Sequence, residues 1–77
     1  PLAVNKRIAE RLFLKTYDLE LEMAKDYHIW AYRKAAWTVD EMLESVDKIY
    51  KEQGETGLRE LPGIGKSIAG QIARWLG

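Results

Sequence analysis

The chain of 77 residues contains no cysteine and a single histidine. Without cysteine it forms no disulfide, offers no thiolate nucleophile and has no Cys-ligated zinc site. One histidine is too few for a histidine-based metal site. Its apolar runs are a few residues long, far short of the ~20 that cross a bilayer, and no basic-then-apolar signal peptide is present. We therefore expect a soluble, cytoplasmic module that makes no contact with membranes.

Residues that break helices are also scarce. Proline occurs only at positions 1 and 62, and no glycine precedes Gly54. The chain is 47% hydrophobic and 31% charged, a composition typical of folded domains. It has no fixed-period repeat, no low-complexity tract and no strand-like alternation. The sequence predicts an all-α fold, with residues 1–77 forming one compact domain of four helices and short turns.

The first two helices follow from apolar spacing in the N-terminal half of the chain. The first is expected to begin at Asn5 as its N-cap and to end near residue 21. Residues 23–28 have weaker patterning and are expected to form a turn before the second helix. The expected core-facing residues are Val4, Ile8, Leu12, Phe13, Tyr17 and Leu21 in the first helix, and Ile29, Tyr32, Ala36, Val39 and Leu43 in the second.

The C-terminal half predicts two shorter helices. Ser45 is expected to cap the third helix, and Gly54 and Gly57 are expected to mark its end. The last helix is expected to cover residues 66–76. Their predicted inward residues are Val46, Ile49 and Tyr50, followed by Ile68, Ala69, Ile72 and Leu76.

The charge is balanced overall but uneven along the chain. Twelve Lys and Arg residues match twelve Asp and Glu residues, so the formal net charge is zero. Residues 59–77, however, carry Arg59, Lys66 and Arg74 against Glu60 alone. Tight sequence-independent nucleic-acid binding normally requires a strongly basic face. Any affinity for a polyanion is therefore expected to be modest and to lie near the C-terminus.

Residues 58–76 are the most informative segment of the sequence, and they read LRELPGIGKSIAGQIARWL. Gly63 and Gly65 permit positive φ and remove the Cβ atoms that would hold a phosphate away from the backbone. Ile64, between them, is expected to turn inward. The N–H groups of Gly65, Lys66 and Ser67 would then lie unpaired at a helix N-terminus, where the macrodipole also favours an anion.

A tight turn between two packed helices would also explain Pro-Gly-x-Gly on its own. The full pattern is more restrictive, because leucines precede it and apolar residues at helical spacing follow it. In this form the segment resembles the helix-hairpin-helix motif of DNA-binding proteins. The resemblance implies DNA binding through backbone phosphates, which would be independent of sequence because phosphate contacts carry no base information.

Two further stretches extend the resemblance to most of the chain, roughly residues 5–76. The residues AYRKAA at 31–36 and NKRIAE at 5–10 are similar to the N-terminal domain of family X DNA polymerases. In polymerase beta that domain has 5′-deoxyribose-phosphate lyase activity. The resemblance implies a four-helix array ending in the hairpin, a role in DNA repair or replication, and a preference for ends, gaps or nicks.

The lyase chemistry itself is not expected to be retained. It needs a neutral lysine amine that attacks the sugar aldehyde and forms a Schiff base. The family places this lysine where the chain has Gln71, whose amide is not nucleophilic. Two further family lysines match Ser67 and His28, whereas the pocket tyrosine matches Tyr32 and the base-stacking aromatic matches Tyr27. Lys34 remains as an alternative amine.

The resemblance also implies contacts around the hairpin that add positive charge. The family hairpin holds a monovalent cation, Na⁺ or K⁺, through backbone carbonyls, which correspond here to those of Arg59, Leu61 and Ile64. The side chains of Lys66 and Arg74 are expected to contact the DNA backbone.

A helical protein-interaction domain that has lost its DNA ligand is the alternative interpretation. Trp30 and Trp37 lie seven residues apart, on one edge of the second helix. We expect them to complete the core; otherwise they would present a patch for self-association or for a neighbouring domain. Trp75 is expected to pack near the C-terminus. The acidic residues Asp40, Glu41, Glu44 and Asp47 are interpreted as a solvated helix face.

Overall fold

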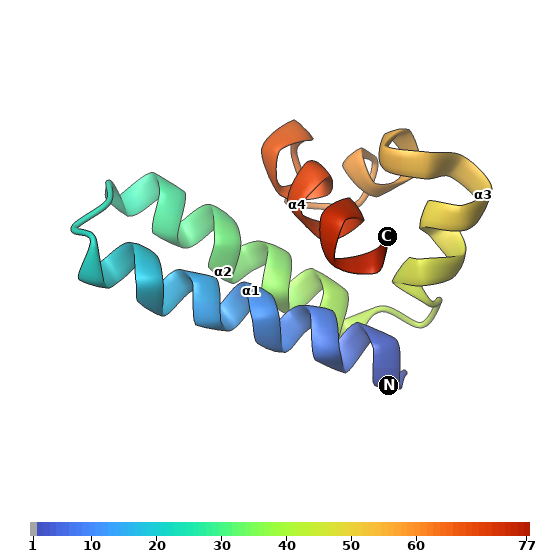
Figure 1. The fold of residues 1–77 in the computed structure, drawn as a ribbon, viewed down its shortest axis with the longest axis horizontal. Helices are drawn as coiled ribbons and strands as arrows, with labels where there is room; N and C mark the ends of the chain where they lie inside the picture. Colours follow the sequence, from blue (N-terminus) through green and yellow to red (C-terminus); the bar gives the residue numbers. More distant parts are fainter. Residues whose placement is uncertain (1) are drawn as a thin grey trace.

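The computed structural model describes residues 2–77 and confirms the all-α fold. Four helices follow one another: α1 (Ala3–Leu21), α2 (Asp26–Glu41), α3 (Val46–Arg59) and α4 (Lys66–Leu76). As Figure 1 shows, α1 and α2 form a long antiparallel pair, and α3 and α4 pack across one end of it. Within residues 2–77, no helix combines the length and hydropathy that crossing a membrane would require.

The structure corrects both ends of the second helix. It begins at Asp26 and not near residue 29, so Tyr27 and His28 lie in its first turn. The carboxylate of Asp26 is favourable there because the helix N-terminus carries partial positive charge. The helix ends at Glu41, and the next residue, Met42, is extended with ψ 141°. Leu43 therefore leaves the helix and is 96% exposed, contrary to its expected place in the core.

Asn5 is not the N-cap of α1, since the helix begins two residues earlier and Asn5 is fully buried inside it. Its side chain instead bonds the segment that leads into α3. The Asn5 Oδ1 accepts from the backbone N–H of Val46 at 2.8 Å, and its Nδ2 donates to the carbonyl of Glu44 at 2.8 Å. Asn5 thus satisfies one of the N-terminal amides of α3, which has no partner within its own helix.

The third helix begins as predicted, and the Oγ of Ser45 accepts from the backbone N–H of Lys48 at 3.4 Å. Gly54 has φ 66° and ψ −159°, so the helix is broken there, and helical structure resumes through Arg59. Gly57 does not end the helix but is buried in this second stretch. A Cβ on Gly57 would lie only 2.5 Å from the Cβ of Gln53, so the close packing of the two stretches requires glycine.

The core confirms most of the predicted inward faces. Buried apolar residues come from every helix and from the hairpin: Ile8, Leu12, Ala36, Val39, Val46, Ile49, Leu58, Ile64, Ile68, Ala69 and Ile72. Two residues of the expected α1 strip are exposed instead, Tyr17 at 62% and Leu21 at 84%. The reason is visible in Figure 1, where the far end of the α1–α2 pair extends beyond α3 and α4.

Candidate nucleic-acid interface

The hairpin between α3 and α4 is held by one buried side chain and two hydrogen bonds. Gly63 has φ 76°, a conformation that favours glycine. Ile64 is only 3% exposed, as predicted, and its N–H donates to the carbonyl of Leu61 at 3.1 Å. The hydroxyl of Thr38 on α2 donates to the carbonyl of Pro62 at 2.8 Å. The hairpin is therefore fixed both to the core and to α2.

The backbone amides at the start of α4 are free. Gly65 is the N-cap residue, with φ −91° and ψ −172°, and no side chain caps the helix. Among residues 2–77, the N–H groups of Gly65, Lys66 and Ser67 donate no hydrogen bond. All three residues are exposed. The amides are thus available to an anion from solvent, and the positive end of the α4 dipole lies at the same point.

A pocket of about 290 Å³ joins this helix start to the first turns of α2. It brings together seven of the eight side chains and glycines predicted to contact DNA: Tyr27, His28, Tyr32, Gly63, Gly65, Lys66 and Ser67. The rings of Tyr27 and His28 lie 4.3 Å apart between centroids and are tilted by 32°. Tyr32 is half-buried, so it both packs on the core and lines the pocket. The pocket offers amide donors, hydroxyl groups and an aromatic edge to one ligand.

The eighth predicted residue, Arg74, does not line this pocket. It lies in the last turn of α4, and its Nη2 donates to the Oε1 of Gln71 at 3.1 Å. Two residues that the sequence did not single out as contacts lie beside the hairpin instead. A Cβ built on Gly63 would be 3.7 Å from the Cβ of Lys34 and 3.8 Å from the Oγ1 of Thr38. Their spacing of four places them on one face of α2, but the sequence does not show that this face meets the hairpin.

The backbone carbonyls proposed to hold a cation fit that role in part. The carbonyl of Leu61 accepts from the N–H of Ile64. Within residues 2–77, those of Arg59 and Ile64 accept no backbone hydrogen bond. Neutral carbonyl oxygens are suitable ligands for hard cations.

The structure does not bear out the expected burial of the tryptophan pair. Trp30 and Trp37 are each 47% exposed, with ring centroids 6.3 Å apart in an edge-to-face arrangement. The guanidinium of Arg33 covers Trp30 at 4.9 Å from its centroid and pairs with Glu20 at 3.2 Å. Trp75, by contrast, packs against the core as expected.

The comparison with protein families agrees with this geometry. A family model described as a helix-hairpin-helix domain matches residues 4–77, which include α1 and α2 as well as the hairpin. No curated protein and no solved structure gives a significant match. Helix-hairpin-helix domains generally bind nucleic acid. With a match over nearly its whole length, the chain belongs to the helix-hairpin-helix domain family.

Proposed function

We propose that this domain binds DNA independently of sequence by holding backbone phosphates at the hairpin. The observation that carries the proposal is the set of free, exposed amides of Gly65, Lys66 and Ser67 at the start of α4. A phosphate oxygen accepts hydrogen bonds and bears the charge that a helix N-terminus favours. Lys66 adds a positive side chain beside the same amides, and Lys34 on α2 lies next to Gly63.

The resemblance to family X DNA polymerases refines this proposal. Tyr27, Tyr32 and His28 line the pocket next to the amides, as the family arrangement implies. We propose that the domain prefers ends, gaps or nicks and acts in DNA repair or replication. A Na⁺ or K⁺ ion held by the carbonyls of Arg59 and Ile64, with that of Leu61, would supply positive charge next to the phosphate.

We propose further that the domain is not a lyase. Gln71 stands where the family has its Schiff-base lysine, and its carbonyl oxygen accepts a hydrogen bond from Arg74. Lys66 is the one lysine that lines the pocket. Ser67, and not Lys66, matches a family lysine. Lys66 lies one residue before Ser67 on α4, and a step of one residue rotates a side chain by about 100° around the helix axis, so the Lys66 amine points in a different direction from that family lysine. Borohydride trapping on an incised abasic site is therefore expected to yield no covalent adduct, and an adduct would refute this part of the proposal.

A salt titration tests the DNA-binding proposal. Fluorescence anisotropy would compare labelled duplexes that are intact, nicked or gapped with a 5′-phosphate. Each neutralised phosphate contributes about 0.9 to the slope of log K against log salt for duplex DNA. Two or three hairpin contacts predict a slope of about −2 to −3 and the strongest binding to the gapped duplex. Absence of binding to all three at low salt would refute the proposal.

Protein association through the tryptophan pair is a second candidate function, favoured by the half-exposed rings of Trp30 and Trp37. Because the formal net charge is zero, two copies of the chain repel each other less than two copies of a highly charged protein would. Sedimentation at rising concentration tests this idea. A dimer that the double change Trp30→Ala and Trp37→Ala abolishes would support it, whereas a monomer at all concentrations would exclude self-association.

A further inference from the structure

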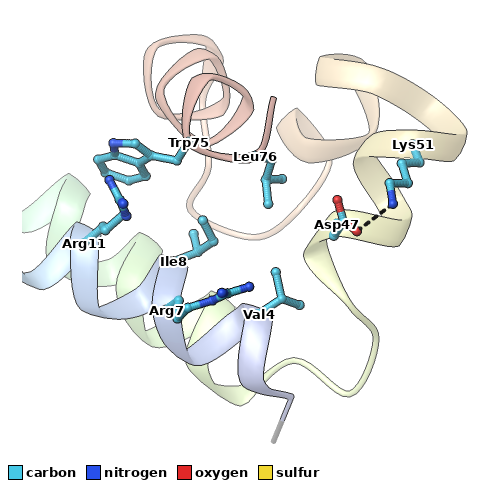
Figure 2. Close-up of a pocket in the computed structure, with 8 residues that line it drawn as sticks. All are labelled: Val4, Arg7, Ile8, Arg11, Asp47, Lys51, Trp75 and Leu76. Atoms are coloured by element: carbon cyan, nitrogen blue, oxygen red, sulfur yellow. Dashed lines mark ion pairs between the residues drawn. The ribbon is translucent and has the colours of Figure 1, made fainter.

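A second pocket, of about 430 Å³, lies at the opposite end of α4 from the hairpin. Its walls come from the first half of α1, the first turns of α3 and the last turn of α4, as Figure 2 shows. The two pockets are separated by the length of α4, whose 11 residues span roughly 16 Å. A ligand in this second pocket therefore contacts different residues from one held at the hairpin.

The second pocket carries an excess of positive charge. Arg7 forms no ion pair within the part of the chain that the structure describes, and Arg11 lies only over an aromatic ring. The acidic side chain at the opposite wall, Asp47, is paired with Lys51 at 3.1 Å. The N-terminus of α1 adds partial positive charge, which no acidic residue in its first turn offsets. Glu10 on α1 and the C-terminal end of α4 carry opposing charge, but Glu10 lies outside the pocket lining and forms no ion pair with Arg7 or Arg11.

The pocket also offers surfaces on which a flat, apolar group can lie. Trp75 is half-buried, and the guanidinium of Arg11 is 5.8 Å from its ring centroid. In Figure 2 the apolar side chains of Ile8 and Leu76 are seen to the right of this pair and above Arg7. An aromatic ring beside arginines that have no carboxylate partner is the combination by which proteins bind single-stranded nucleic acid, since bases stack and phosphates pair with charge.

We propose that this pocket is a second nucleic-acid site, which holds one nucleotide unit of a single strand. The base takes the place of the Arg11 guanidinium over the Trp75 ring, and the adjoining phosphates pair with Arg7 and the displaced Arg11. This inference rests on the proposed DNA-binding function and extends it, because a strand leaving a gap or a frayed end would be bound at both ends of α4. An acidic peptide would satisfy the arginines but would leave the tryptophan ring without a stacking partner.

Trp75 provides a direct spectroscopic readout. In a protein carrying Trp30→Phe and Trp37→Phe, Trp75 is the sole tryptophan, and a 16-residue oligothymidylate serves as the probe. Stacking of a base on the ring is expected to quench its emission at low salt. The same titration in the hairpin variant Gly65→Asp is expected to retain quenching, because the second pocket does not include the hairpin. A glutamate hexadecapeptide is expected to leave the emission unchanged.

Charge reversal at Arg7 tests the phosphate contact. Arg7→Glu is expected to weaken oligothymidylate binding about tenfold, since one hydrogen bond to a charged group is lost. It should also reduce the salt slope by about 0.7, the contribution of one phosphate in a single strand. Lys48→Glu is the matched control, because it makes the same change in charge at an exposed residue that lies outside the pocket. A glutamate there also suits the helix start, three residues after the Ser45 cap.

The outcomes separate this inference from the function on which it rests. DNA binding by anisotropy without any change in Trp75 emission would refute the second site and leave the hairpin function standing. Absence of both DNA binding and Trp75 quenching would refute both the hairpin function and the second site. Quenching with unchanged DNA affinity in Gly65→Asp would support the second site and count against the hairpin. Equal quenching by the glutamate peptide, or equal weakening by Lys48→Glu and Arg7→Glu, would refute the assignment to a nucleotide.

Discussion

Replacement of Gly65 by aspartate is expected to make the domain more stable and, at the same time, to weaken its binding of gapped DNA through the hairpin. Gly65 is the N-cap of α4, its φ of −91° is ordinary for any residue, and a Cβ there meets no atom within 4 Å. An aspartate side chain fits without strain and accepts hydrogen bonds from the free amides of the first turn. It therefore occupies the donors that we assign to phosphate, and it places a negative charge where the phosphate would lie.

The expected magnitudes follow from these contacts. Restricting the unfolded chain contributes about 0.4–1 kcal/mol, and a negative charge at a helix N-terminus about 0.3–1 kcal/mol. For a domain of this size, a gain of about 1 kcal/mol raises Tm by about 4–8 °C. Loss of two amide–phosphate bonds at about 1.5 kcal/mol each weakens DNA binding by roughly 100-fold.

Thermal unfolding followed by circular dichroism and anisotropy with gapped DNA measure the two effects on the same samples. Gly65→Asn caps the helix without a charge and is expected to bind more weakly than the wild type but better than Gly65→Asp. Lys48→Gln lowers the net charge by the same single unit away from the hairpin and should leave binding nearly unchanged. A stabilised Gly65→Asp protein that binds gapped DNA as tightly as the wild type would show that the amides do not hold phosphate.

Three further substitutions test the fold that supports the site, each by urea unfolding. Gly63→Ala is expected to cost about 1–2 kcal/mol because its φ is 76°, although its neighbours leave room for a methyl group; an unchanged midpoint would contradict the positive φ. Asn5→Ala should cost about 2–4 kcal/mol, since it leaves the Val46 amide and the Glu44 carbonyl without their partner; a cost below about 0.5 kcal/mol would argue against these bonds. Leu43→Ser should change stability by less than about 0.5 kcal/mol because Leu43 is exposed, and a large loss would restore it to the core.

The parts of the fold that follow from local chemistry were predictable from the sequence. Ser45 caps α3, and Ile68 and Ile72 face inward from α4, as the spacing and residue types indicate, whereas Gly54 interrupts α3 where it was expected to end it. The hairpin was predictable for the same reason, because the conformation of Gly63 and the burial of Ile64 depend on neighbours within a few residues.

The parts that depend on contacts between distant residues were not predictable. Leu43 and Leu21 fit an apolar spacing, but one lies beyond the end of its helix and the other beyond the region that α3 and α4 cover. Trp30 and Trp37 share a helix edge whose burial depends on which elements pack against it. The second pocket was missed for the same reason, because Arg7 and Trp75 are brought together only by the tertiary fold.

The Asn5 side chain affects the order in which the two helix pairs form and separate. Its bond to the Val46 amide joins positions 41 residues apart and links the α1–α2 pair to the α3–α4 pair. Because such a long segment is costly to close, each pair is expected to form before this bond does. The Val46 amide should consequently exchange its hydrogen only when the two pairs separate, whereas the amides at the exposed start of α4 exchange from the folded state. Trimming the first turn of α1 would thus loosen the half of the molecule that carries the hairpin.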